Sequence, residues 1–195
     1  RKESSAASDV YKRQTFDPKI QEAAEEVLEY TFREKVDPNS EAQVAIVIMS
    51  PDGAVRAMIG GRQLQVLGAF NRSTQALRQP GSAFKPIVYA AALEQGYKPN
   101  DLIRDEAFEI EIPGSGTWTP QNNEKKFNGI VTLTDALSKS LNIPAIKLAQ
   151  RVGLENVRQI SKDLGINSKI STNPAVALGV SETTLLELTG AYGTI

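Results

Sequence analysis

A break in the chain at Pro80-Gly81, followed at once by an apolar stripe with helical spacing, is the feature that most constrains the fold. It predicts a half-buried helix from Ser82 to Gln95 that ends at Gly96. The apolar positions of this helix are Phe84, Ile87, Val88, Ala91 and Ala92. A proline is tolerated in the first turn of a helix, so Pro86 is compatible with it. The helix needs a core to pack against, and a chain of 195 residues is long enough to form one.

The start of this helix also carries a serine and a lysine three residues apart. Residues at i and i+3 share a helix face, so Ser82 and Lys85 can touch. The sequence contains no histidine, which excludes a Ser-His-Asp arrangement. A lysine activates a serine when burial or nearby positive charge lowers the lysine pKa, and Arg78 is a candidate for that charge. By itself a Ser-x-x-Lys pattern is expected about once by chance in such a chain, and a solvated helix face is the alternative.

A second group of polar residues follows near position 140. The pattern from Thr132 to Asp135 is a capping box and predicts a short helix. Pro144 is expected to start the next helix. Ser140 and Asn142 then lie at the junction between two helices, where a bend can direct a hydroxyl and an amide into a cleft. Serine and asparagine also act as simple caps at such junctions.

Taken together, these motifs resemble the transpeptidase domain of class A (bifunctional) penicillin-binding proteins, a group within the serine acyltransferases that include the β-lactamases. The likeness begins at Thr15-Phe16-Asp17-Pro18, runs to the last residue and covers roughly nine-tenths of the chain. It includes Asn71-Arg72, the stretch from Gln75 to Ser82, Pro120, Asn122, the stretch from Gly129 to Leu133, and Ala177-Leu178-Gly179. The resemblance implies an α+β fold, a helical lobe packed on an antiparallel sheet.

The resemblance also implies a role for each motif residue. Ser82 accepts the acyl group, and Lys85 is its base. Ser140 relays a proton to the leaving amine, and Asn142 binds the peptide backbone of the substrate. We therefore expect Ser82 Oγ, Lys85 Nζ and Ser140 Oγ to converge within hydrogen-bond reach, with Asn142 directed into the same space. No metal or cofactor is needed for such an acyl transfer.

The polar segment from 114 to 128 leads into the second motif. We therefore expect Trp118, Gln121 and Asn122 to line the substrate cleft. A surface loop with one half-buried tryptophan is the alternative interpretation.

The family's third motif, Lys-Thr-Gly or Lys-Ser-Gly on a strand at the sheet edge, does not occur in this sequence. That strand supplies an oxyanion-hole amide and holds the donor carboxylate, so we expect this chain to be inactive alone. Thr184, with Glu187 three residues later, is expected to cap the start of a helix whose apolar pattern runs to Ile195 without a stop signal. We expect the rest of the domain to follow it. Residues 1–14 are expected to be a non-native or disordered tail, 15–40 a linker helix, and 41–195 a partial transpeptidase domain.

The remaining elements are predicted from breakers and periodicity. Asp17 and Pro18 start an amphipathic helix that reaches about Thr31. A strand from Gln43 to Met49, apolar at every position after Gln43 and so expected to be buried on both faces, precedes a Ser50-Pro51-Asp52-Gly53 turn. A second strand from Ala54 to Ile59 completes a hairpin. A short strand is expected from Phe108 to Ile112 and a helix from about Glu155 to Leu164.

The implied function is a peptidoglycan D,D-transpeptidase that attacks acyl-D-Ala-D-Ala stem peptides and is acylated by β-lactams. The implied location is the extracytoplasmic face of the membrane, with an anchor outside this chain. A net charge of −1 argues against nucleic acid as a partner. The oligomeric state stays open.

Two alternatives share these motifs. A serine β-lactamase needs a base that activates water, and the Glu-x-x-Asn pattern that supplies it in class A enzymes is absent between Asn142 and Ile195. A non-catalytic β-lactam sensor keeps the fold without turnover, and both visible motifs are intact. The sequence beyond Ile195 discriminates between the enzyme and the sensor.

Overall fold

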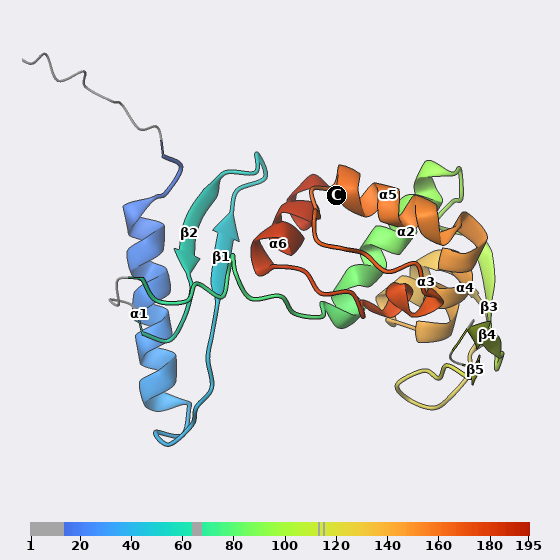
Figure 1. Ribbon diagram of the computed structural model, residues 1–195, viewed down its shortest axis with the longest axis horizontal. Coiled ribbons are helices and arrows are strands. Elements are labelled where there is room, and N and C mark those ends of the chain that lie inside the picture. Colours follow the sequence, from blue (N-terminus) through green and yellow to red (C-terminus); the bar gives the residue numbers. More distant parts are fainter. Residues whose placement is uncertain (1–13, 64–67, 113, 115) are drawn as a thin grey trace, which may run out of the picture.

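The computed structural model describes residues 14–63, 68–112, 114 and 116–195, so most of the predicted tail lies outside the described residues (Figure 1). Its α-helices are α1 (Pro18–Glu34), α2 (Lys85–Glu94), α3 (Leu133–Ser138), α4 (Asn142–Val152), α5 (Leu154–Asp163) and α6 (Leu185–Thr194). Two 3₁₀ helices are η1 (Gly81–Phe84) and η2 (Pro174–Leu178). The strands form antiparallel pairs: β1 (Ile46–Met49) with β2 (Val55–Ile59), β3 (Leu102–Asp105) with β6 (Gly129–Thr132), and β4 (Ile110–Ile112) with β5 (Gly116–Trp118). The fold is α+β, as predicted.

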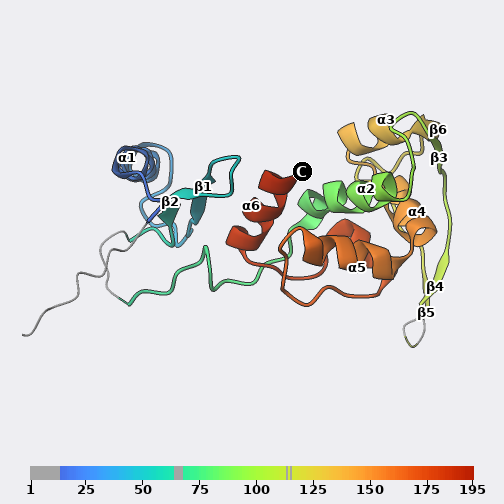
Figure 2. The ribbon, with the colours of Figure 1, turned by 90° about the horizontal axis from the view of Figure 1, so that it is seen from above.

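The β1–β2 hairpin lies between two helices (Figures 1 and 2). Helix α1 begins where the sequence predicts, because Asp17 Oδ1 accepts a hydrogen bond from the backbone N–H of Lys19 at 2.9 Å. Its Ala24 and Leu28 pack with Ile59 of β2. Helix α6 packs on β1 from the other side. The hairpin is therefore covered by a helix on each side, and the expected domain boundary at residue 41 stays a prediction.

Strand β1 differs from the prediction in length and burial. It covers Ile46–Met49 rather than the whole of 43–49, and all four of its side chains are half-buried rather than buried on both faces. Among the described residues, β1 pairs with β2 alone, so one of its edges has no neighbouring strand to cover it. The predicted hairpin itself is confirmed, with Gly53 at φ +80° in its turn.

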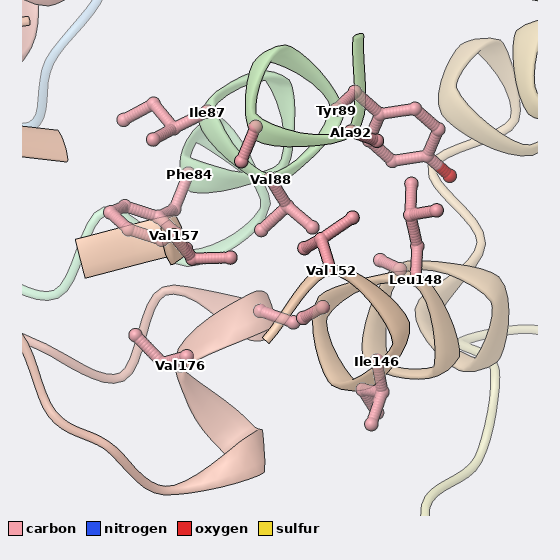
Figure 3. Close-up of a cluster of buried hydrophobic side chains, with 14 of the residues drawn as sticks. Phe84, Ile87, Val88, Tyr89, Ala92, Ile146, Leu148, Val152, Val157 and Val176 are labelled. Atoms are coloured by element: carbon pink, nitrogen blue, oxygen red, sulfur yellow. The ribbon is translucent and has the colours of Figure 1, made fainter. Parts of the chain in front are cut away.

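The main core lies among α2, α4 and α5. Phe84, Ile87 and Val88 are fully buried, which confirms the apolar stripe. Helices α2 and α4 contribute facing side chains to this core, among them Val88 and Val152 (Figure 3). Each such side chain contributes about 1.5 to 3 kcal/mol of hydrophobic stabilisation, so this packing fixes the position of the residues at the start of α2.

The predicted helix from Ser82 to Gln95 is divided in two. Residues 81–84 form the 3₁₀ turn η1, and the α-helix proper starts at Lys85. The cause is Pro86, whose nitrogen carries no hydrogen and cannot bond the carbonyl of Ser82 four residues earlier. That carbonyl accepts from the N–H of Lys85 instead, which is the 3₁₀ spacing.

Three short strands lie in a stretch that the sequence pattern leaves irregular: β3, β5 and β6. Of the predicted strand 108–112, only Ile110–Ile112 is observed. Strand β3 alternates between exposed and buried residues, but Asp105 occupies an inward position that the pattern reserves for an apolar residue. The predicted helix from Glu155 is observed as α5, and the Thr184 to Glu187 capping box starts α6 as expected.

Candidate active site

Ser82 lies in η1, and the chain just before it is held by a neighbouring segment. Arg78 and Thr183 exchange two backbone hydrogen bonds of 3.0 Å, and the N–H of Gly81 donates to the Gly179 carbonyl at 3.2 Å. A Cβ on Gly179 would overlap the backbone of Gly81, so only glycine permits this crossing. The Ala177-Leu178-Gly179 motif of the sequence therefore fixes the position of the Ser82 turn.

Lys85 is the buried centre of the site, with 1% of its surface exposed. Its Nζ donates to the Ser140 carbonyl at 2.6 Å, to Ser140 Oγ at 3.1 Å and to Asn142 Oδ1 at 2.7 Å. Burial lowers the pKa of Lys85 to about 8. The expectation that Arg78 lowers this pKa is wrong, because the Arg78 guanidinium bonds the Leu77 carbonyl and burial is the cause.

The hydroxyl of Ser82 is exposed, and among the described residues it makes no hydrogen bond to Lys85 or Ser140. The predicted convergence is thus found for Lys85, Ser140 and Asn142 but not for Ser82. In the ammonium form, each of the three hydrogens of Lys85 has an acceptor other than Ser82. The Ser82 hydroxyl can donate to Nζ only when the amine is neutral and has a lone pair.

Ser140 occupies a backbone position that usually requires glycine. Helix α3 ends in a Schellman turn, in which Ser140 N–H bonds the Leu137 carbonyl and Leu141 N–H bonds the Ala136 carbonyl, both at 2.9 Å. Ser140 is the residue after the C-cap, Lys139, and its backbone is in the left-handed conformation with φ +51°. A non-glycine residue there is strained, and such strain is typical of functional sites. The turn directs both the carbonyl and the hydroxyl of Ser140 to Lys85.

Asn142 is the first residue of α4, which starts two residues before the predicted Pro144. A proline is accepted anywhere in the first turn, where the N–H groups have no partner within the helix, so the helix extends back past it. Asn142 Nδ2 donates to the Gln121 carbonyl at 2.9 Å and to Asn123 Oδ1 at 3.3 Å. Its oxygen is therefore directed to Lys85.

The residues expected to line a cleft have different places. Asn122 is buried, and both ends of its amide are bonded within the protein, so it lies behind the site and offers no group to a ligand. Gln121 contributes its backbone carbonyl to Asn142. Trp118 is half-buried opposite Ile110 and packs on the core, and its place in a cleft stays a prediction.

Glu187 has a second role besides the helix capping that the sequence predicts: it holds the segment that positions the Ser82 turn. Its carboxylate accepts from Ser168 Oγ at 2.6 Å and from Thr183 Oγ1 at 2.8 Å, as well as from backbone N–H groups. Burial opposes ionisation, but these hydrogen bonds outweigh it and lower the pKa of Glu187 to about 2. Glu187 thereby holds Thr183, the residue that pairs with Arg78 before the Ser82 turn.

Among the described residues, no group of three or more acidic, histidine or cysteine side chains could hold a metal ion. Within the same ranges, no helix combines the length and apolar character that crossing a membrane requires.

Comparison with known proteins identifies the family. The family described as "Penicillin binding protein transpeptidase domain" matches residues 44–194. This chain belongs to that family.

Individual proteins similar to this chain are known from several bacteria. The chain is 43% identical over 157 residues to penicillin-binding protein 1A of Rickettsia felis, a match that covers 80% of this chain and 20% of that protein. The crystal structure of penicillin-binding protein 1A from Haemophilus influenzae superposes with a TM-score of 0.72 at 35% identity, over 78% of this chain and 23% of that one. PonA1 of Mycobacterium tuberculosis, solved in complex with penicillin V, gives 0.77 at 27% identity, over 93% of this chain and 50% of that one. The chain thus spans about a fifth of the length of the curated relatives it matches.

Proposed function

We propose that Ser82 is the acyl-accepting nucleophile of a peptidoglycan D,D-transpeptidase. Ser82 Oγ attacks the carbonyl of the penultimate D-alanine and its proton passes to Lys85 Nζ. The peptide bond to the terminal D-alanine then breaks, and a proton relayed through Ser140 Oγ leaves with the amine. An amine of a neighbouring strand takes the acyl group and restores the free serine. A β-lactam acylates the same oxygen by opening its ring.

The observation that carries this proposal is the environment of Lys85. A buried lysine with a pKa of about 8 is neutral in roughly a tenth of the molecules at pH 7, enough to act as a base. The hydroxyl of Ser140, 3.1 Å from Nζ, connects that base to the space in front of the site. A fully exposed lysine would supply far less of the neutral form.

Asn142 is proposed to bind the substrate backbone. Its Nδ2 makes one short bond to the Gln121 carbonyl and one longer bond, of 3.3 Å, to the exposed Asn123. A peptide carbonyl of the substrate replaces the longer bond at little cost. The oxygen of Asn142 meanwhile stays on Lys85.

The partners and location follow from the proposed reaction. The substrates are peptidoglycan stem peptides, and β-lactams are inhibitors. Peptidoglycan is assembled outside the cytoplasm, so the natural protein is proposed to act at the extracytoplasmic face of the membrane.

The test is labelling of the natural protein, at its full length, with a fluorescent penicillin. Ser82→Ala and Lys85→Ala are expected to abolish labelling. Lys147→Ala is the matched control, because Lys147 is also largely buried and hydrogen-bonded, to Glu106 at 3.3 Å, but lies outside the site. The 195-residue chain alone, without the third motif, is expected to remain unlabelled.

The same assay separates the alternatives. Continuous release of hydrolysed penicillin supports a serine β-lactamase. Stoichiometric labelling without transpeptidation of a D-Ala-D-Ala peptide supports a sensor. Undiminished labelling of the Lys85→Ala variant contradicts the proposed base.

A further inference from the structure

Asp105 is a fully buried carboxylate without a cationic partner among the described residues. It accepts hydrogen bonds from amide groups instead. Asn122 Nδ2 lies 2.8 and 3.0 Å from its two oxygens, and Asn128 donates its backbone N–H at 2.9 Å and its side-chain amide at 2.7 Å. A buried charge without a counter-ion is costly, so its place in β3 calls for a role other than packing.

The first consequence concerns the orientation of Asn122. Because a carboxylate only accepts, the NH₂ group of Asn122 must face Asp105, and its oxygen must face the other way. The same NH₂ group also donates to the Lys126 carbonyl at 2.8 Å. Asp105 therefore determines where the Asn122 oxygen lies.

That oxygen caps helix α4. Asn122 Oδ1 accepts from the backbone N–H of Asn142 at 2.9 Å and of Ile143 at 3.3 Å. The local N-cap residue, Leu141, has no side-chain acceptor, so the helix start relies on a residue 20 positions earlier.

The neighbours of Asn122 fix the Asn142 side chain in turn. Gln121 and Asn123 accept from its Nδ2, which leaves its oxygen 2.7 Å from Lys85 Nζ. A continuous series of hydrogen bonds thus runs from Asp105 through Asn122 and Asn142 to Lys85. Every amide in the series has a single orientation that satisfies its partners.

We propose that Asp105 and Asn122 are positioning residues that hold Asn142, and through it Lys85, in the geometry that acylation of Ser82 requires. The inference rests on the proposed function of Ser82 and Lys85. It gives strand β3 and the segment 121–123 a part in the acylation step. Neither Asp105 nor Asn122 touches the substrate in this proposal.

The competing explanation is that Asp105 only stabilises β3 and β6. The two explanations differ in what an amide at position 105 does. Asp105→Asn keeps the size and burial of the side chain but replaces one acceptor oxygen with an NH₂ group. That NH₂ group then faces donors of Asn122 or Asn128, so one amide must turn or lose its bond. A turn of Asn122 would place NH₂ against the N–H groups that start α4.

The experiment measures the acylation of the natural protein by a fluorescent penicillin with stopped-flow mixing. Varying the penicillin concentration separates affinity for the initial complex from the first-order acylation step. Asp105→Asn is expected to slow the acylation step about 10- to 100-fold, the effect of misplacing a reacting group by around 1 Å. Affinity for the initial complex is expected to change much less.

Two further variants distinguish positioning from stability. The exchange Asp105→Asn with Asn122→Asp restores a donor and an acceptor in contact and keeps acceptors for the α4 N–H groups. It loses the bond to the Lys126 carbonyl, so it should recover part of the lost rate. Ile103→Val is the matched control, since Ile103 is 1% exposed on the same face of β3. It should lower the Tm and leave the acylation step unchanged.

The outcomes are decisive in each case. A folded Asp105→Asn variant that acylates like Ile103→Val, or a folded double variant as slow as the single one, overturns the inference. If Asp105→Asn does not fold, Asn128→Ala removes one exposed donor and should slow acylation about 2- to 10-fold, the range of one hydrogen bond. An unchanged rate in that variant also overturns it. A penicillin adduct on a residue other than Ser82 instead contradicts the proposed function.

Discussion

Replacing Ser140 with glycine and with alanine separates the strain at this position from the use of its hydroxyl. Both variants lose Oγ and its 3.1 Å bond to Lys85 Nζ. They differ only in whether a Cβ must be accommodated at φ +51°. The pair therefore isolates the cost of a side chain in the left-handed conformation.

The magnitude follows from the two opposing effects. A Cβ in the left-handed region costs roughly 1 to 2 kcal/mol. Glycine loses about 0.5 to 1 kcal/mol more backbone entropy on folding than alanine does. Ser140→Gly should therefore be about 0 to 1.5 kcal/mol more stable than Ser140→Ala, with a central value of about 0.75 kcal/mol, or roughly 1.5 to 3 °C in Tm for a domain of this size.

The assay combines thermal unfolding with penicillin labelling of the natural protein. The transition of this domain is identified in the wild-type protein, where acylation by penicillin shifts it, and the corresponding transition is then followed in both variants. Both variants should acylate about 10² to 10⁴ times more slowly, since each lacks the proton relay. A glycine variant less stable than the alanine variant would refute the strain argument, and normal acylation would refute the relay.

Three further predictions concern stability. Gly179→Ala should lower the Tm by several degrees and slow labelling, because its Cβ would overlap the Gly81 backbone that precedes Ser82. Tyr89→Phe should leave the Tm unchanged or raise it, because the buried hydroxyl has no hydrogen-bond partner in the described part of the chain and burial raises its pKa (Figure 3). For Glu187, whose pKa falls from 4.5 to about 2 on folding, the ionised form is stabilising above pH 4.5 and this contribution disappears as the pH falls to about 2. Denaturant midpoints of wild type and Glu187→Gln should therefore converge over that pH range, and a constant difference would contradict the assignment.

The sequence predicts the parts of the site that depend on local patterns. Pro80-Gly81 and the apolar stripe place Ser82 and Lys85 at a helix start. Thr132, whose Oγ1 accepts from the Asp135 N–H, starts the short helix that places Ser140 at a junction. Each of these signals involves residues only a few positions apart. The structure confirms that these helices exist and have approximately the predicted bounds, because contacts between residues close in sequence determine them.

What the sequence does not predict depends on contacts between distant segments. Asp105 finds its amide partners 17 and 23 residues away and interrupts the alternation by which β3 could be recognised. Glu187 bonds a loop 19 residues before it. Arg78 is near Lys85 in sequence, yet burial, which only the packed structure defines, sets the pKa of the lysine.

The central claim is that Ser82 is acylated with Lys85 as its base, and mass spectrometry of the penicillin-treated natural protein tests it most directly. Peptide mapping should locate one penicilloyl adduct on Ser82 in the wild-type protein. It should find no adduct in a folded Lys85→Ala variant, whose apolar stripe at Phe84, Ile87 and Val88 is intact. An adduct on another residue, or equal modification of the Lys85→Ala variant, would contradict the mechanism.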